Sequence, residues 1–143
     1  MTKHILCSID LAYLEEAAAI LVEAEKQTTL ANAKLTVITV IPDYRSSWVG
    51  SFFKEGTLRK AALAASEQLR ELVKNTLPNQ ENVNCMVEIG VVYEKVLHTI
   101  KKLNIDLVVL GAHKPNVIDR LIGPNASRIV RKSPASTLVI RLK

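Results

Sequence analysis

Aromatic residues, glycine and cysteine are all scarce in this sequence. Phe, Trp and Tyr make up only 4% of the 143 residues, so the core must be built mainly from Ala, Leu, Ile and Val. The two cysteines, Cys7 and Cys85, lie in apolar, strand-like segments. Residues 1–10 hold too short an apolar stretch for a signal peptide. We therefore expect a cytoplasmic protein whose cysteines are reduced core residues.

The signatures of several functional classes are missing as well. No apolar run approaches the roughly 20 residues that cross a bilayer. The chain has no G-x-S-x-G nucleophile elbow, no P-loop, and no cluster of His, Cys, Asp and Glu at metal-ligand spacing. Its net charge is +5, but no basic run is interleaved with aromatics. We expect no catalytic residues, no metal held by the protein alone, no nucleic-acid partner and no direct membrane insertion.

Apolar runs and amphipathic stretches alternate along the whole chain. The runs predict strands and the stretches predict helices, in the order β-α-β-α-β-α-β-α-β. The predicted strands are residues 4–9, 35–41, 83–89, 106–110 and 136–141, and the predicted helices are residues 13–30, 56–76, 92–103 and 124–132.

This order predicts an α/β fold with one domain over residues 1–143. Apolar strands joined by crossover helices are typical of a parallel sheet that is buried on both faces. An open, doubly wound, five-stranded sheet with helices on both faces is the simplest such topology. Residues 106–110 form the most apolar strand, so we expect that strand at the centre of the sheet.

Three segments follow strands and are candidates for ligand binding, because ligands of such sheets bind beyond the carboxyl ends of the strands. They are residues 8–10, 40–42 and 111–127. In the third, Gly111 leaves a strand and Gly123 opens a helix, with Pro124 in its first turn. Glycine allows close approach of the backbone to a phosphate, and a helix N-terminus offers unpaired N–H groups.

Three stretches of the sequence resemble the universal stress protein family. They are the apolar first strand that ends in Asp10, the second strand over residues 35–41, and the glycine-headed helix and last strand over residues 123–141. The resemblance covers essentially the whole chain. It implies an adenine nucleotide α-hydrolase-like fold and a stress-response protein that binds a nucleotide.

The nucleotide-binding branch of this family carries the pattern G-x2-G-x9-G-[S/T]. Gly111 and Gly123 supply its first and last glycines, whereas Lys114 stands in place of the middle glycine and Pro124 in place of the Ser or Thr. Eight residues separate Lys114 from Gly123. The His-Lys-Pro and Gly-Pro-Asn-Ala runs resemble a subgroup typified by the F and G paralogues of enterobacteria.

The resemblance implies a role for each matching residue. Asp10 would anchor the base or ribose, Val40 would pack on the adenine, and the helix headed by Gly123 would hold phosphate, with Mg²⁺ or Mn²⁺ bridging the phosphate oxygens. The nucleotide would be ATP, ADP or AMP. The implied binding residues are Ser8, Ile9, Asp10, Val40, Leu110, Gly111, His113, Lys114, Gly123, Pro124, Asn125, Ala126 and Ser127.

The last strand is the candidate interface of a homodimer. A terminal strand is often a sheet edge, and exposed apolar edges tend to be paired. Members of the resembling family dimerise through their last strand, which implies an interface centred on Thr137, Leu138, Val139 and Ile140.

Two functions remain open at this point. The first is a dimeric nucleotide-dependent switch, with at most slow hydrolysis or autophosphorylation, because no residue is evident as a base for water. The second is a nucleotide-free dimeric adaptor that regulates a transporter or an enzyme. Asp10 and the two glycines favour the switch, whereas Lys114 and Pro124 favour the adaptor.

Overall fold

The computed structural model describes residues 2–42, 55–112 and 122–142. Each predicted element is present, with bounds within one residue of the prediction. The strands are β1 (His4–Ser8), β2 (Lys34–Ile41), β3 (Asn84–Ile89), β4 (Leu107–Gly111) and β5 (Ser136–Ile140), and the helices are α1 (Leu14–Ala31), α2 (Glu55–Thr76), α3 (Val92–Lys102) and α4 (Pro124–Lys132).

The five strands form one parallel sheet in the order β3-β2-β1-β4-β5. The predicted α/β fold is therefore confirmed. The expectation that β4 is central was wrong: β1 occupies the centre, and β4 lies between β1 and β5. Both strands have neighbours on each side and are buried at their middle residues. Apolar composition thus identifies interior strands but does not rank them.

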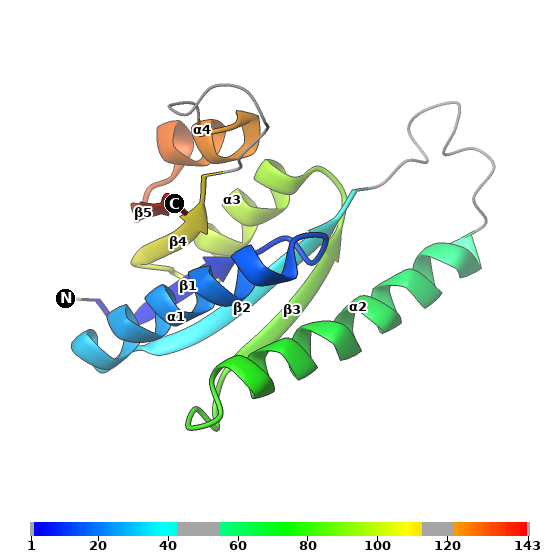
Figure 1. Ribbon diagram of the computed structural model, residues 1–143. Helices are drawn as coiled ribbons and strands as arrows, with labels where there is room; N and C mark the ends of the chain where they lie inside the picture. The colour runs from blue at the N-terminus through cyan, green and yellow to red at the C-terminus, as the bar shows by residue number, and fades with distance from the viewer. Residues whose placement is uncertain (1, 43–54, 113–121, 143) are drawn as a thin grey trace.

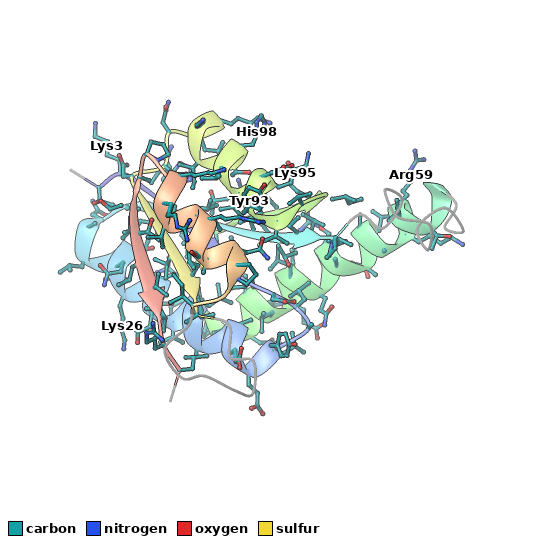
Figure 2. All side chains as sticks on the ribbon, turned by 90° about the horizontal axis from the view of Figure 1, so that it is seen from above. Lys3, Lys26, Arg59, Tyr93, Lys95 and His98 are labelled. Atoms are coloured by element: carbon teal, nitrogen blue, oxygen red, sulfur yellow. The ribbon has the colours of Figure 1, made fainter. Side chains whose placement is uncertain are left out.

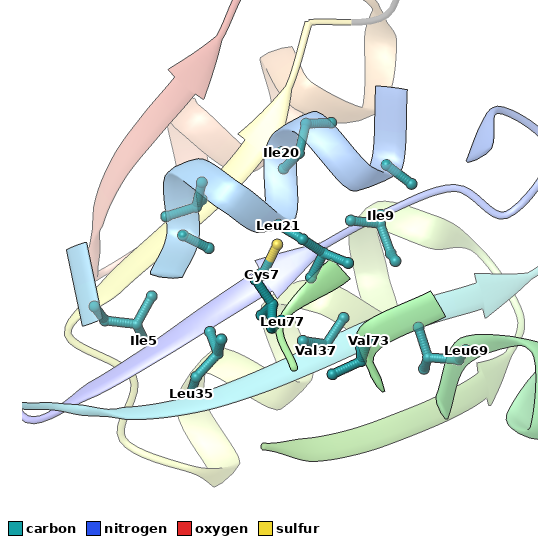
Figure 3. Close-up of a cluster of buried hydrophobic side chains, with 13 residues drawn as sticks. Ile5, Cys7, Ile9, Ile20, Leu21, Leu35, Val37, Leu69, Val73 and Leu77 are labelled. Carbon is teal, nitrogen blue, oxygen red and sulfur yellow. The ribbon is translucent and has the colours of Figure 1, made fainter. Parts of the chain in front are cut away.

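Two helical layers enclose the sheet, with α1 and α2 on one face and α3 and α4 on the other (Figure 1). Alternate residues of β1 serve the two layers, as strand geometry requires. Ile5 and Cys7 belong to the buried cluster that includes Leu21 of α1 and Leu69 of α2 (Figure 3), whereas Leu6 belongs to the cluster on the α3 and α4 side. None of the described helices is long and apolar enough to cross a membrane.

Asparagine residues turn the chain from helix to strand at two places. Asn32 follows α1 with φ 52° and ψ 49°, and Asn104 follows α3 with φ 52°. This left-handed conformation is disfavoured for most residues but tolerated by asparagine. After each, a backbone N–H bonds back to the helix: Ala33 donates to Thr28 at 3.0 Å, and Ile105 to Ile100 at 3.0 Å.

Polar contacts join the amino-terminal ends of the adjacent strands β1 and β4. The Oδ2 atom of Asp106 accepts the backbone N–H groups of Lys3 at 2.8 Å and His4 at 3.0 Å. These hydrogen bonds hold the pKa of Asp106 below its ordinary value. The His4 ring bonds Thr36 Oγ1 at 2.7 Å, and partial burial together with the charge of Lys34 lowers the His4 pKa. His4 is therefore a half-buried residue whose ring is hydrogen-bonded.

Both cysteines are free thiols, as the sequence predicts. Cys7 is fully buried on the central strand, and burial strongly raises the pKa of its thiol. Cys85 is half-buried on the edge strand β3, where burial also raises its pKa.

Candidate functional site

The chain reverses its direction of travel across the sheet between β1 and β4. From β1 it proceeds through β2 to β3, and then returns to add β4 and β5 on the other side of β1. The carboxyl ends of β1 and β4 therefore lie side by side, and the connections that follow them lead toward opposite edges of the sheet. This is the position at which open α/β sheets bind ligands.

A pocket of about 510 Å³ lies at this position. Its volume falls within the usual range of roughly 300–1,000 Å³ for small-molecule sites. Its walls come from the ends of three strands and from parts of α1, α3 and α4. The lining residues are Ser8, Ile9, Asp10, Ala12, Tyr13, Glu16, Ala17, Ile20, Val40, Pro42, Val92, Leu110, Gly111, Ala112, Ile122, Gly123, Pro124, Asn125, Ala126 and Ile129.

The turn after β1 places Asp10 at the pocket wall. Ile9 extends the pairing of the strand, because its N–H donates to the Ile38 carbonyl at 3.0 Å. Asp10 Oδ1 accepts the N–H of Ala12 at 2.9 Å, and the Asp10 carbonyl accepts the N–H of Tyr13 at 3.2 Å. The N-cap of α1 is Tyr13. Asp10 is therefore a turn residue before the helix rather than the helix cap, and its side chain remains exposed.

Gly111 lets α1 approach the end of β4 closely. A Cβ atom at this position would overlap the Cδ1 atom of Ile20 and lie 3.3 Å from its Cγ1 atom. Both residues line the pocket. The absence of a side chain at Gly111 therefore allows Ile20 to form part of the wall.

The amino-terminal end of α4 forms the opposite wall. Gly123 is the N-cap, with φ 82° and ψ 159°, a conformation that favours glycine. Pro124 is the first helical residue and has no N–H group. Ser127 donates its N–H to the Gly123 carbonyl at 3.0 Å. Within the first turn, the N–H groups of Asn125 and Ala126 consequently lack a helical acceptor and point toward the helix end.

Ten of the thirteen residues implied by the resemblance line this one pocket. They are Ser8, Ile9, Asp10, Val40, Leu110, Gly111, Gly123, Pro124, Asn125 and Ala126. Ser127 does not line it; its hydroxyl accepts a hydrogen bond from Arg131 Nη2 at 3.3 Å. His113 and Lys114 lie outside the described residues.

The contribution of α1 and its N-cap to the pocket was not predicted from the sequence. Tyr13, Glu16, Ala17 and Ile20 all line it. Their spacing of three or four residues places them on one face of a helix, and that spacing was visible in the sequence. What the sequence did not show is that this face reaches past the sheet edge to the ends of β1 and β4.

The charged side chains of the described lining residues are the carboxylates of Asp10 and Glu16. Among the residues that the structure describes, no three His, Cys, Asp or Glu side chains are grouped to hold a metal ion. Two carboxylates are hard oxygen donors, a set that suits Mg²⁺ when phosphate oxygens complete the coordination.

Two of the relatives found by comparison with known proteins illustrate the level of sequence identity. Universal stress protein A homolog 1 of Coxiella burnetii is 30% identical over 147 residues, which covers 99% of this chain and 97% of that protein. Universal stress protein G of Shigella flexneri is 30% identical over 77 residues, which covers 54% of each.

Solved structures share the fold over nearly the full length. The universal stress protein of Archaeoglobus fulgidus, in complex with dAMP, has a TM-score of 0.71 at 14% identity and covers 96% of this chain and 97% of its own. A universal stress protein in complex with cAMP has a TM-score of 0.70 at 18% identity, covering 97% of both chains. These likenesses show the fold.

The family itself is established by sequence. A model of the universal stress protein family matches residues 1–141. The resemblance seen in the first two strands and the glycine-headed helix is thereby confirmed, including the similarity to the G paralogue of enterobacteria. This chain belongs to the universal stress protein family.

Proposed function

We propose that this universal stress protein binds an adenine nucleotide in the pocket between β1 and β4 and acts as a nucleotide-dependent regulatory switch. One observation carries the proposal. Ten of the residues implied by the family resemblance line a single pocket, and this pocket lies where the strand order reverses between β1 and β4. Two structures with the same fold hold cAMP and dAMP, both adenine nucleotides, which supports this ligand class.

The shape of the pocket suggests how the nucleotide lies. Apolar surface for the adenine comes from Val40, Ile9 and Leu110. The carboxylate of Asp10 can accept a hydrogen bond from the amino group of the base or from a ribose hydroxyl group. The phosphate lies at the amino-terminal end of α4, where the N–H groups of Asn125 and Ala126 and the positive end of the helix dipole favour an anion.

A divalent cation would accompany the phosphates. Mg²⁺ in nucleotide sites is usually held by one or two carboxylates together with phosphate oxygens and water. Asp10 and Glu16 are the carboxylates in this pocket. Since Asp10 is assigned to the base or ribose, Glu16 would hold Mg²⁺ or Mn²⁺ together with phosphate oxygens, and the cation would neutralise part of the phosphate charge.

Binding and release, rather than turnover, would be the activity of this site. The side chains assigned above bind and orient a nucleotide, and none of them is assigned as a base that activates water. We expect at most slow hydrolysis or autophosphorylation. Sustained multiple-turnover ATP hydrolysis by the purified protein would contradict this part of the proposal.

The first experiment is mass spectrometry of small molecules released from the purified protein, followed by calorimetric titration with Mg-ATP, ADP and AMP. Gly123→Glu places a carboxylate at the phosphate end of α4 and should abolish micromolar binding. Two controls separate the causes of that loss. Gly123→Ala carries the backbone strain of the positive φ without the charge, and Gly56→Glu adds the same charge at an open position on α2.

Retained binding in both controls, with loss in Gly123→Glu, would support a phosphate site at α4. If the wild-type protein releases no nucleotide and gives no heat with any of the three, the switch is wrong. The second function, a nucleotide-free adaptor, then becomes the better description. Lys114 and Pro124 are the features that favour it. Proline removes one N–H donor that a phosphate would otherwise use.

The proposed dimer uses the sheet edge formed by β5. This strand has β4 on one side and no strand of the described chain on the other. Thr137, Leu138, Val139 and Ile140 are all only half-buried there. We expect a homodimer in sedimentation analysis at tens of micromolar, and Leu138→Lys to shift it toward monomer. A monomeric wild-type protein at that concentration would contradict the dimer.

A further inference from the structure

The two helical layers differ in charge. Helices α3 and α4 carry six Lys and Arg residues against one Glu, a balance of +5. Helices α1 and α2 carry five against seven, a balance of −2. We call the six cations of α3 and α4 the basic layer. They are Lys95, Lys101, Lys102, Arg128, Arg131 and Lys132.

Helix dipoles explain only part of this concentration of charge. Lys101, Lys102, Arg131 and Lys132 lie in the last turns of their helices, where a cation is favourable. Arg128 lies in the middle of α4, outside the last turn. The dipole therefore gives no reason for a cation at this position.

Tyr93 of α3 holds two of the cations in place. The Arg128 Cζ atom lies 4.7 Å, and the Lys132 Nζ atom 5.6 Å, from the centroid of its ring. Figure 2 shows Tyr93 on the side of α3 near α4, with His98 farther from α4. The two cations are also one helical turn apart, an arrangement in which like charges repel. The ring thus fixes a pair of like charges side by side.

No acidic side chain among the described residues neutralises the basic layer. Among the described residues, the ion pair that is formed joins Lys26 and Glu23 of α1 at 3.0 Å, away from the basic layer. The acidic residue of α3, Glu94, accepts a hydrogen bond from the Tyr93 hydroxyl at 3.4 Å. Arg128, Arg131 and Lys132 are exposed to solvent.

We infer that the basic layer is a docking surface for an acidic segment of a partner protein, centred on Arg128 and Lys132. A carboxylate placed between these two side chains would relieve their mutual repulsion. The planar guanidinium of Arg128 can donate two parallel hydrogen bonds to one carboxylate. The surface lies on the outside of the α3 and α4 layer, so its occupation does not require an empty nucleotide pocket.

Two other polyanions fit this surface less well. The Tyr93 ring already contacts two cations, whereas single-stranded nucleic-acid sites offer open aromatic rings to the bases. Anionic membranes favour helices with an extended apolar face. The large apolar side chains exposed beside this layer, within the described residues, are Val91 and Val130, a small area for insertion among lipids.

The test uses the full chain and a short fluorescent peptide of alternating Glu and Gly residues, with a Gln-Gly peptide as its neutral counterpart. Fluorescence anisotropy should show binding of the Glu peptide, weakening as salt is raised. Arg128→Glu combined with Lys132→Glu should weaken it by roughly tenfold or more. The matched control is Arg59→Glu combined with Lys60→Glu, two exposed cations of α2 that give the same change in net charge.

Several outcomes would overturn the inference. They are an absence of Glu-peptide binding, equal weakening in both charge-reversal variants, or tighter binding of a DNA oligonucleotide or phosphatidylserine vesicles through the same two residues. If the reversed variant does not fold, Arg128→Gln with Lys132→Gln provides the test, with Arg59→Gln and Lys60→Gln as its control. Tyr93→Phe keeps the ring and should retain binding, whereas Tyr93→Leu should weaken it.

Discussion

The two layers that cover the sheet are built differently. Helices α1 and α2 are 18 and 22 residues long, and the core beneath them contains 13 buried residues. Helices α3 and α4 are 11 and 9 residues long, above a core of nine buried residues. The first layer is acidic in balance and the second is basic. The first layer thus covers the larger buried cluster, and the second presents charge.

The pocket draws on both layers. Glu16 and Ile20 come from α1 and Tyr13 is its N-cap, whereas Ala126 and Ile129 come from α4. A long, deeply packed helix therefore provides one fixed wall, and a short helix provides the wall with the exposed N–H groups. Because α4 packs mainly on β5 and α3, its position depends on fewer contacts than that of α1, which packs on three strands and on α2.

The difference in packing predicts the largest effects. Leu21→Ala removes a fully buried side chain at the centre of the first layer. It should lower the free energy of unfolding toward the upper end of the usual range of about 2–5 kcal/mol, because the surroundings cannot close the cavity. Ile129 is 2% exposed on the shorter helix α4. The loss of unfolding free energy in Ile129→Ala should therefore lie toward the lower end of this range. Urea denaturation measures both.

The neighbour of Leu21 provides the control. Val22 is 39% exposed on the same helix, so Val22→Ala should change the free energy of unfolding by less than about 1 kcal/mol. Equal losses of unfolding free energy for Leu21→Ala and Ile129→Ala would show that the two layers are equally rigid.

A middle-sized effect is expected where α1 meets the end of β4. The methyl group of Gly111→Ala would overlap the end of the Ile20 side chain. Overpacking of this kind costs about 1–3 kcal/mol. Ile20→Val removes the overlapping Cδ1 atom, so the double variant should recover part of the loss. A double-mutant cycle by thermal or urea unfolding measures this coupling. Strictly additive costs would show that the two side chains do not share this space.

The smallest effect is expected at the amino-terminal ends of the strands, where Asp106 contacts Lys3 and His4. Asp106 has a lowered pKa in the folded protein because its carboxylate accepts two backbone N–H groups. Its contribution to stability is therefore fully present above its ordinary pKa of 3.8 and is lost as the pH falls through the lower folded-state value.

Unfolding of Asp106→Ala across pH measures this contribution. The difference in free energy of unfolding from the wild type should be constant near neutral pH and should shrink in acid. Asp106→Asn keeps an acceptor oxygen that does not titrate, and so it isolates the charge. A difference that stays the same down to pH 2 would argue that the backbone contacts of Asp106 do not depend on its ionisation.

The fold was predictable because local patterns and the global topology agree. Apolar runs of strand length alternate with amphipathic stretches, and α4 begins and ends at the predicted Pro124 and Lys132. Strand order was less accessible. The neighbours of a strand depend on which helices share a face, and the middle residues of β1 and β4 are buried alike. The buried face of α1 was also less accessible from the sequence, because the apolar residues Leu14 and Val22 are exposed while Ile20 is buried.

The site was predictable where it lies next to strand ends. Ligands of open α/β sheets bind beyond the carboxyl ends of the strands. This tendency and the family pattern together identified Asp10, Val40 and Gly111 without knowledge of the fold. The α1 wall required the distance between a helix face and a strand end, which periodicity alone does not give. The close contact of Gly111 and Ile20 is an example: each residue was visible in the sequence, but their meeting depends on how α1 crosses β4.

The positions of the two thiols make the molecule its own unfolding reporter. Cys7 is fully enclosed on the central strand, and its raised pKa keeps it in the unreactive thiol form. A reagent can modify it only after the sheet separates, so its labelling rate follows global opening. Cys85 is half-buried at the β3 edge, so its labelling follows local fraying of that edge. The labelling rates of the two thiols thus report global opening and local fraying separately in one chain.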